Sequence, residues 1–419
     1  MVQSVLNSLT LGYRPLWSRA RRLAGVQLFV HEEPGRNADM PHLLRTLAEM
    51  WNNQAPPLLL SPQSRQVLCN LLEHAPQGSP WIEVNGNWLR QDEGIFELVQ
   101  QAKARGLTLV WSGALNQLPD ADAAQGFVSS LLRLPPEGAQ GLRNEPDFSD
   151  LPSFKAAAIP LAAKPLNLLD GQMYEGLQNL ELARLCLDSH DAGAVAGWPV
   201  VDTVRAFRLQ QPQPARDSVR RLMQAIDAEQ SIDQLEHLLG EDPVLAYRFM
   251  LYTNSAALGL RRGVDSLRRG LVMMGLGTLQ RWLSDQLPHA CTHADLVPLR
   301  TQMVVRARLA EELIEAGVSL ELQREMYLCC LFSQMDLLLH EPLATLLRRM
   351  PLSERIFDAV INNTGPYAEV LQMSAALAST DAATIRRLRE QGQWEAEELN
   401  RMLLRILSDL KLGMPEKLA

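Results

Sequence analysis

The chain has 419 residues, enough for two to three domains, which excludes a single small module. With 47% hydrophobic and 21% charged residues, it has the composition of an ordinary folded protein, which excludes a disordered or fibrous chain. A formal net charge of -8 excludes the binding of nucleic acid or an anionic membrane through a global basic field.

The first half of the chain, residues 1–208, alternates short β-prone runs with amphipathic helical stretches. The β-prone runs are residues 25–31, 57–61, 81–84, 107–111 and 154–161, and the helical stretches are 41–51, 63–74 and 93–106. This alternation predicts an α/β fold, a parallel sheet with crossover helices that is either open or closed into a barrel.

A polar, proline-bearing stretch, residues 209–218, is predicted to be a linker, because proline disfavours helix at the residue before it. Residues 219–419 then have an all-α pattern. Ser231 and Gln234 have the spacing of a capping box, and Asp242 before Pro243 is typical of a helix start. Further helices are predicted over residues 295–317, 320–340, 353–363, 366–379, 381–392 and 394–412.

The segments 242–259 and 264–283 carry several separated elements in a fixed order, and together they resemble the signature of HDOD domains. The resemblance covers about residues 217–379, and it implies a helical domain related to HD-type metal-dependent phosphohydrolases. We expect its signature residues to have structural or interaction roles rather than catalytic ones. They are Asp242, Pro243, Asn254, Ser255, Ser266 and Gly275.

The His-Asp pair that an HD enzyme requires is not found in this half. The corresponding helix reads LFSQMDLL, in which Asp336 stands alone. The one other candidate for metal binding is the group His289, Cys291 and His293, which offers imidazole and thiolate ligands for zinc. Because this spacing matches no known finger, we favour a structural or exposed loop, with a zinc site as the alternative.

The first half resembles EAL domains in five segments, at residues 11–33, 81–84, 104–113, 174–186 and 196–200. This resemblance implies a TIM-like barrel. Since the half is short for an eight-stranded barrel, we expect that a strand or a helix is missing.

Active EAL domains, by this resemblance, hydrolyse cyclic di-GMP with two metal ions bound by Glu, Asn and Asp. Here the matching positions hold neutral residues: Gln27, Trp111, Ser112 and, in one register, Gln178; a second register places Leu166 at the last of these positions. Glu83 remains, but one carboxylate does not hold two metal ions. We therefore predict a degenerate, catalytically silent EAL-like domain without cofactors.

These features favour a catalytically inactive regulator or scaffold of bacterial signal transduction that acts on signalling proteins through protein–protein interaction. The alternative is a receptor for cyclic di-GMP or another nucleotide, and a surviving phosphodiesterase or HD-type phosphohydrolase is a third hypothesis. The amphipathic last helix, residues 394–413, is expected to pack on the HDOD-like bundle or to form a homodimer or partner contact.

We expect a cytoplasmic protein with no membrane insertion and no nucleic acid partner. Five cysteines without paired spacing indicate reduced thiols rather than a disulfide framework. The first residues lack the pattern of a signal peptide, and no segment approaches the roughly 18 apolar residues that span a bilayer.

Overall fold

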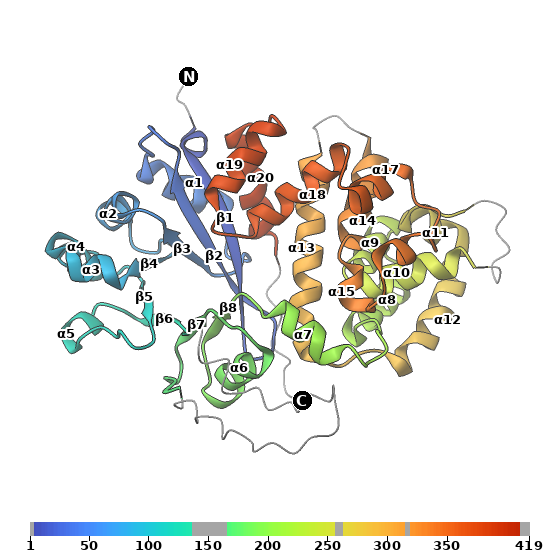
Figure 1. The fold of residues 1–419 in the computed structure, drawn as a ribbon, viewed down its shortest axis with the longest axis horizontal. Helices are drawn as coiled ribbons and strands as arrows, with labels where there is room; N and C mark the ends of the chain where they lie inside the picture. The colour runs from blue at the N-terminus through green and yellow to red at the C-terminus, as the bar shows by residue number, and fades with distance from the viewer. Residues whose placement is uncertain (1–3, 136–165, 256–262, 315–318, 411–419) are drawn as a thin grey trace, which may run out of the picture.

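The computed structural model describes residues 4–135, 166–255, 263–314 and 319–410. These residues form a β-barrel, flanked by helices, and a helical half beside it (Figure 1). The expectation of a TIM-like barrel followed by a helical region is therefore confirmed.

The barrel is closed by eight strands in sequential order, so the expectation of a missing strand was wrong. Strands β2 to β8 run parallel, but β1 is antiparallel to both of its neighbours, β2 and β8. The predicted strand at residues 154–161 lies outside the described residues. The strands are β1 (Leu9–Trp17), β2 (Leu23–Glu32), β3 (Leu58–Pro62), β4 (Trp81–Asn85), β5 (Leu109–Ala114), β6 (Ser129–Arg133), β7 (Met173–Glu175) and β8 (Ala194–Ala196).

The helices around the barrel start at the side-chain caps that the sequence offers. Asp39, Ser64 and Asn179 each accept a hydrogen bond from a backbone amide in the first turn of a helix. The elements are η1 (Val5–Ser8), α1 (Met40–Met50), α2 (Arg65–His74), α3 (Gly86–Gln91), α4 (Glu93–Ala104), α5 (Ala121–Ala124), α6 (Leu180–Arg184), the π-helical turn η3 (Leu185–Ser189) and α7 (Val200–Phe207).

The helical half begins after an irregular segment that runs from residue 208 to 215. Its elements are α8 (Arg216–Asp227), α9 (Ile232–Gly240), α10 (Pro243–Thr253), α11 (Leu267–Met274), α12 (Leu276–Gln286), η5 (Leu287–His289), η6 (Ala294–Leu296), α13 (Val297–Leu313), α14 (Leu320–Phe332), α15 (Met335–Leu339), α16 (Leu343–Leu347), α17 (Glu354–Phe357), η7 (Asp358–Asn362), α18 (Pro366–Leu377), α19 (Ala382–Gln391) and α20 (Ala396–Ser408). The predicted capping box of Ser231 and Gln234 is present. The helix predicted over residues 320–340 is instead two helices, because the chain turns at Ser333, whose hydroxyl donates to the carbonyl of Cys330.

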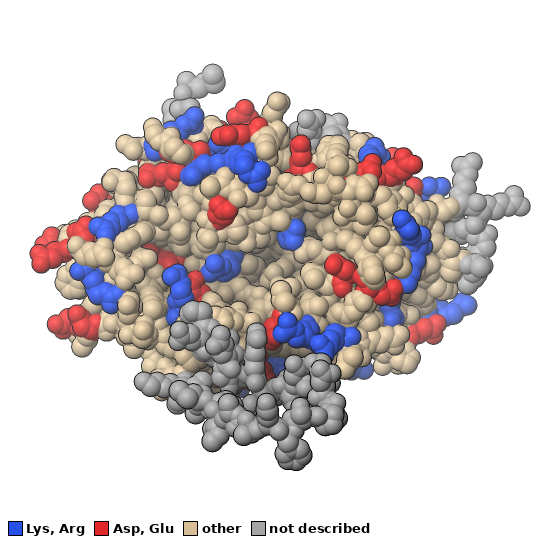
Figure 2. All heavy atoms as spheres, viewed as in Figure 1, with Lys and Arg blue, Asp and Glu red and all other residues tan. Residues whose placement is uncertain are grey.

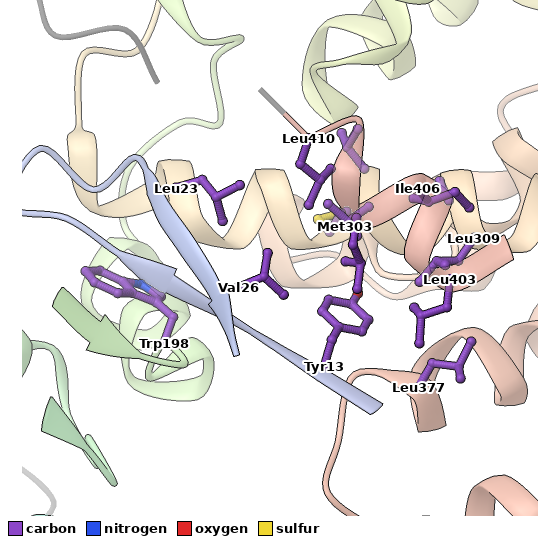
Figure 3. Close-up of a cluster of buried hydrophobic side chains, with 14 of the residues drawn as sticks. Tyr13, Leu23, Val26, Trp198, Met303, Leu309, Leu377, Leu403, Ile406 and Leu410 are labelled. Carbon is purple, nitrogen blue, oxygen red and sulfur yellow. The ribbon is translucent and has the colours of Figure 1, made fainter. Parts of the chain in front are cut away.

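One continuous hydrophobic core joins the barrel to the helical half. Tyr13 and Val26, on the β1–β2 hairpin, face Met303 of α13 and Leu403 of α20 (Figure 3). The last helix, α20, packs against both α13 and β1, so it contacts the barrel as well as the helical bundle. In the part of the chain that the structure describes, no helix is long and apolar enough to cross a membrane.

Candidate functional site

The interior of the barrel has an apolar floor with a polar layer above it. The floor consists of Leu16, Leu59, Val110, Leu131, Met173, Ala194 and Ala196. Above it, at the carboxyl ends of the parallel strands, lies a cavity of about 480 Å³, which we call the mouth. Its polar lining includes Arg14, Gln27, Ser61, Gln63, Glu83, Asn85, Arg133, Glu175 and Thr380, and its aromatic lining is Phe29, Trp88 and Trp198.

Glu175, at the end of β7, lies between two arginines in the mouth. Its Oε2 is 2.8 Å from Nη1 of Arg14, and its Oε1 is 2.7 Å from Nη2 of Arg133. The guanidinium of Arg14 also lies 5.1 Å from the ring centroid of Phe29, which is a cation–π contact. The negative charge of Glu175 is therefore offset from both sides.

Glu83, in the middle of β4, is held by neutral groups. The amide Nε2 of Gln27 donates to its Oε2 over 2.8 Å, and the side chains of Ser61 and Ser112 also hydrogen-bond to it. Burial raises the pKa of Glu83 despite these hydrogen bonds, and the nearby charge of Glu175 adds to the increase. Among the residues that the structure describes, Glu83 thus has no cationic partner like those of Glu175.

Gln27 leaves one buried hydrogen-bond acceptor unused. The residue is 1% exposed, and its Oε1 has no hydrogen-bond partner among the described residues. A buried polar atom without a partner is costly, so this oxygen is a point where a ligand with an N–H or O–H group would gain a hydrogen bond.

The structure brings three of the predicted pocket residues together: Gln27, Glu83 and Ser112. Trp111 instead faces outward, where its indole packs over Gly86 and forms an edge-on contact with Phe127. Successive residues of a strand point to opposite faces, so Trp111 and Ser112 cannot both enter the barrel.

The last predicted pocket position is corrected as well. Gln178 is exposed and does not line the mouth, and Leu166, the alternative, packs against the hydrophobic core. The charged residues of the mouth that sequence reasoning missed are Arg14, Arg133 and Glu175. Glu175 lies two residues after Met173 on the short strand β7, and Met173 belongs to the floor of the barrel. Because alternate residues of a strand share a face, Glu175 also points into the barrel.

Candidate metal ligands do not converge elsewhere in the described ranges, where no group of three His, Cys, Asp or Glu residues is placed to hold a metal ion. The ring of His293 packs against Phe207, at a centroid distance of 5.1 Å. The amide of Cys291 donates to the carbonyl of Pro214, and the carbonyl of Cys291 accepts from Arg216. The loop with His289, Cys291 and His293 thus holds the irregular segment before α8.

The signature residues of the helical half cap helices or form hydrogen bonds between segments that connect helices. Oδ1 of Asp242 accepts from the amides of Val244 and Leu245 at the start of α10, where Pro243 is the first residue. Ser266 caps α11 in the same way, by accepting from the amide of Arg269. Each of these contacts stabilises the start of a helix.

The remaining signature residues shape the chain between helices. The side chain of Asn254 bonds to both the amide and the carbonyl of Val264, so it links the end of α10 to the residues before α11. Ser255 donates to the carbonyl of Tyr252. Gly275, between α11 and α12, has a φ of 74°, which a residue with a side chain rarely adopts.

Two of the arginines near this signature are paired with acidic residues. Arg268 pairs with Asp233 and Glu236, and Arg269 pairs with Asp265. Figure 2 likewise shows basic and acidic side chains interspersed over the visible face.

The family model of the HDOD domain matches residues 213–339 of this chain. A protein of Bacillus subtilis (strain 168), "Uncharacterized protein YuxH", is 21% identical over 182 residues, which are 42% of this chain and 43% of that protein. The match thus covers less than half the length of the curated relative. A crystal structure of the MmoQ response regulator from Methylococcus capsulatus (strain Bath) aligns with a TM-score of 0.39 and 17% identity, over 46% of this chain and 98% of that chain.

Proposed function

We propose that this chain is a catalytically inactive signalling regulator whose EAL-like barrel and HDOD domain act through protein–protein interaction. The HDOD domain supports the signalling role. The observation that carries the inactivity is the ion pairing of Glu175 with both Arg14 and Arg133.

Hydrolysis by two metal ions requires several anionic ligands that offset the charge of the cations and orient the attacking water. In the mouth, the two guanidiniums take up the charge of Glu175, and they would repel a divalent cation placed beside it. Glu83 is bound by an amide and two hydroxyls, and burial favours its neutral form. This donor set does not suit a two-metal centre.

The test is incubation of the purified protein with cyclic di-GMP and either Mg²⁺ or Mn²⁺. We expect no hydrolysis, and no difference between the wild type and Glu83→Gln. Turnover by the wild type that Glu83→Gln abolishes would overturn the proposal.

The second candidate function is a receptor for cyclic di-GMP or another nucleotide at the mouth. The unpartnered Oε1 of Gln27 favours it, together with the walls formed by Trp88 and Phe29. Aromatic faces stack on nucleobases, and arginines bind phosphates. Calorimetry with cyclic di-GMP is the test: micromolar binding that Trp88→Ala weakens supports a receptor, and no heat at millimolar nucleotide rejects it.

A further inference from the structure

The β1–β2 hairpin has one face that begins in the mouth and continues beyond it. Gly12 pairs with Phe29, Arg14 pairs with Gln27, and Thr10 pairs with His31. Because alternate residues of a strand share a face, these six positions lie on the same side of the hairpin. Arg14, Gln27 and Phe29 line the mouth.

The helical half covers the other end of this face. A Cβ on Gly12 would overlap the carbonyl oxygen of Ser379, so β1 and the segment after α18 are in direct backbone contact. The imidazole of His31 hydrogen-bonds to the backbone of Thr380. Nε of Arg386, on α19, donates to Oγ1 of Thr10 over 3.2 Å. We call residues 378–381 the α18–α19 turn.

Thr380 lines the mouth together with barrel residues. It lies more than three hundred residues after Gln27 in the chain, yet both line the same cavity. The mouth is therefore built from both halves of the molecule, and a molecule that fills it contacts the α18–α19 turn.

The opposite face of the hairpin is also held by the helical half. Tyr13 and Val26 pack toward α13 and α20 (Figure 3). The hairpin thus lies between helical elements on its two faces, and Arg14 ties it to Glu175 on β7, the strand beyond β8 in the barrel. A shift of Arg14 within the mouth would move a strand whose other end holds Ser379 and Arg386.

We propose that occupancy of the mouth is coupled to the docking of α19 and the α18–α19 turn on the barrel, through the β1–β2 hairpin and Thr380. The coupling rests on the receptor function proposed above. A ligand with an acidic group competes with Glu175 for Arg14, and its N–H or O–H groups satisfy Oε1 of Gln27. By linkage, the factor by which docking of α19 changes the affinity of the mouth equals the factor by which a bound ligand changes the docking equilibrium.

The first experiment needs no ligand and compares two arginines that share one partner. Arg14 and Arg133 both pair with Glu175, but Arg14 is on the hairpin and Arg133 is on β6. Amide hydrogen exchange of the full chain is measured by mass spectrometry for Arg14→Gln, Arg133→Gln and the wild type. We expect the amides of α19 to exchange at least about fivefold faster in Arg14→Gln, and at the wild-type rate in Arg133→Gln.

Unchanged exchange of α19 in Arg14→Gln would overturn the coupling, and so would an equal increase in both variants. If Arg14→Gln does not fold, Arg14→Lys and Arg133→Lys give the same comparison, because lysine keeps the charge but loses the planar fork.

The second experiment adds cyclic di-GMP to the wild type and repeats the exchange measurement. Protection of both the mouth strands and α19 supports the coupling, whereas protection confined to the barrel overturns it while the receptor function stands. If the nucleotide does not bind, the receptor function fails, and the arginine variants alone decide whether the hairpin couples the two halves.

Discussion

Arg300 and Asp242 form an ion pair inside the helical half, with Nη1 of the arginine 2.7 Å from Oδ2 of the aspartate. The two side chains are 7% and 1% exposed. The same Oδ2 accepts from the amide of Ala215, and Arg300 also donates to the carbonyl of Gln213. The residue that caps α10 thereby fixes the segment that connects the barrel to the helical half.

We expect Asp242→Ala to destabilise the protein by about 3–5 kcal/mol, because it leaves a buried guanidinium without its partner and removes a helix cap. The measurement is the free energy of unfolding from denaturant titration. The matched control is Asp265→Ala, which removes an exposed pair with Arg269 and should cost less than about 1 kcal/mol. Equal effects of the two substitutions would contradict the structural role of Asp242.

The contact between Gly12 and Ser379 predicts that the barrel does not tolerate a larger residue at position 12. Gly12→Val should cost about 1–3 kcal/mol or more, because the carbonyl oxygen of Ser379 occupies the place of the added Cβ. Gly277→Ala is the control: this helical glycine has open space around its Cα, so alanine should be neutral or stabilise by up to about 1 kcal/mol. Thermal unfolding of both variants tests the contrast.

Glu311, on α13, predicts a loss of stability at alkaline pH. Burial raises its pKa to about 7, and the charges of Glu312 and Glu236 contribute to the increase. The folded protein therefore binds a proton that the unfolded chain has released above its ordinary pKa, so the stabilising contribution is present at low pH and is lost as the pH rises through about 7.

Replacement of the Glu311 carboxyl by a neutral group should remove the cost of burying its charge at high pH. Glu311→Gln is expected to raise the free energy of unfolding by about 1–3 kcal/mol at pH 8 and to leave it nearly unchanged at pH 4. The exposed Glu321→Gln is the control and should show no such dependence on pH. A gain of equal size at both pH values would show that Glu311 acts through packing rather than through its charge.

Local sequence patterns were sufficient to predict the fold class of each half and some of the residues that line the mouth. Alternating strands and helices predicted the barrel, and the resemblance to EAL domains pointed to Gln27 and Glu83. The sequence did not show which of Trp111 and Ser112 points into the barrel. Both faces of a parallel strand are buried, so no polar pattern distinguishes the inner face from the outer one. The geometry of the closed barrel decides which of the two points inward.

Contacts between segments that are far apart in the chain could not be predicted from the sequence, for a different reason. The direction of β1 depends on which neighbours complete the barrel, and no local pattern encodes it. The contact of Thr380 with the mouth depends on how α18 and α19 dock on the hairpin. Such contacts are set by the packing of the whole molecule, so the part of the site that both halves share was missed.

The turn between β1 and β2 supplies a further test of the junction between the halves. Arg21 is 7% exposed, and its guanidinium contacts Asp188 of the barrel at 2.5 Å and Asp295 of the helical half at 2.8 Å. Arg21→Met should destabilise the protein by about 3–5 kcal/mol, because Asp295 stays buried with fewer partners. The neighbouring Arg19→Met removes only an exposed pair with Asp191 and should cost less than about 1 kcal/mol.

The same two variants show whether the charge cluster joins the halves or only stabilises the turn. If Arg21 joins them, hydrogen exchange should increase in Arg21→Met both near Asp188 and in η6, which contains Asp295, since the ion pairs cross the junction. An increase restricted to the turn and η3 would instead show that Asp295 is held well enough by Arg184, whose Nη2 lies 2.7 Å from its Oδ2.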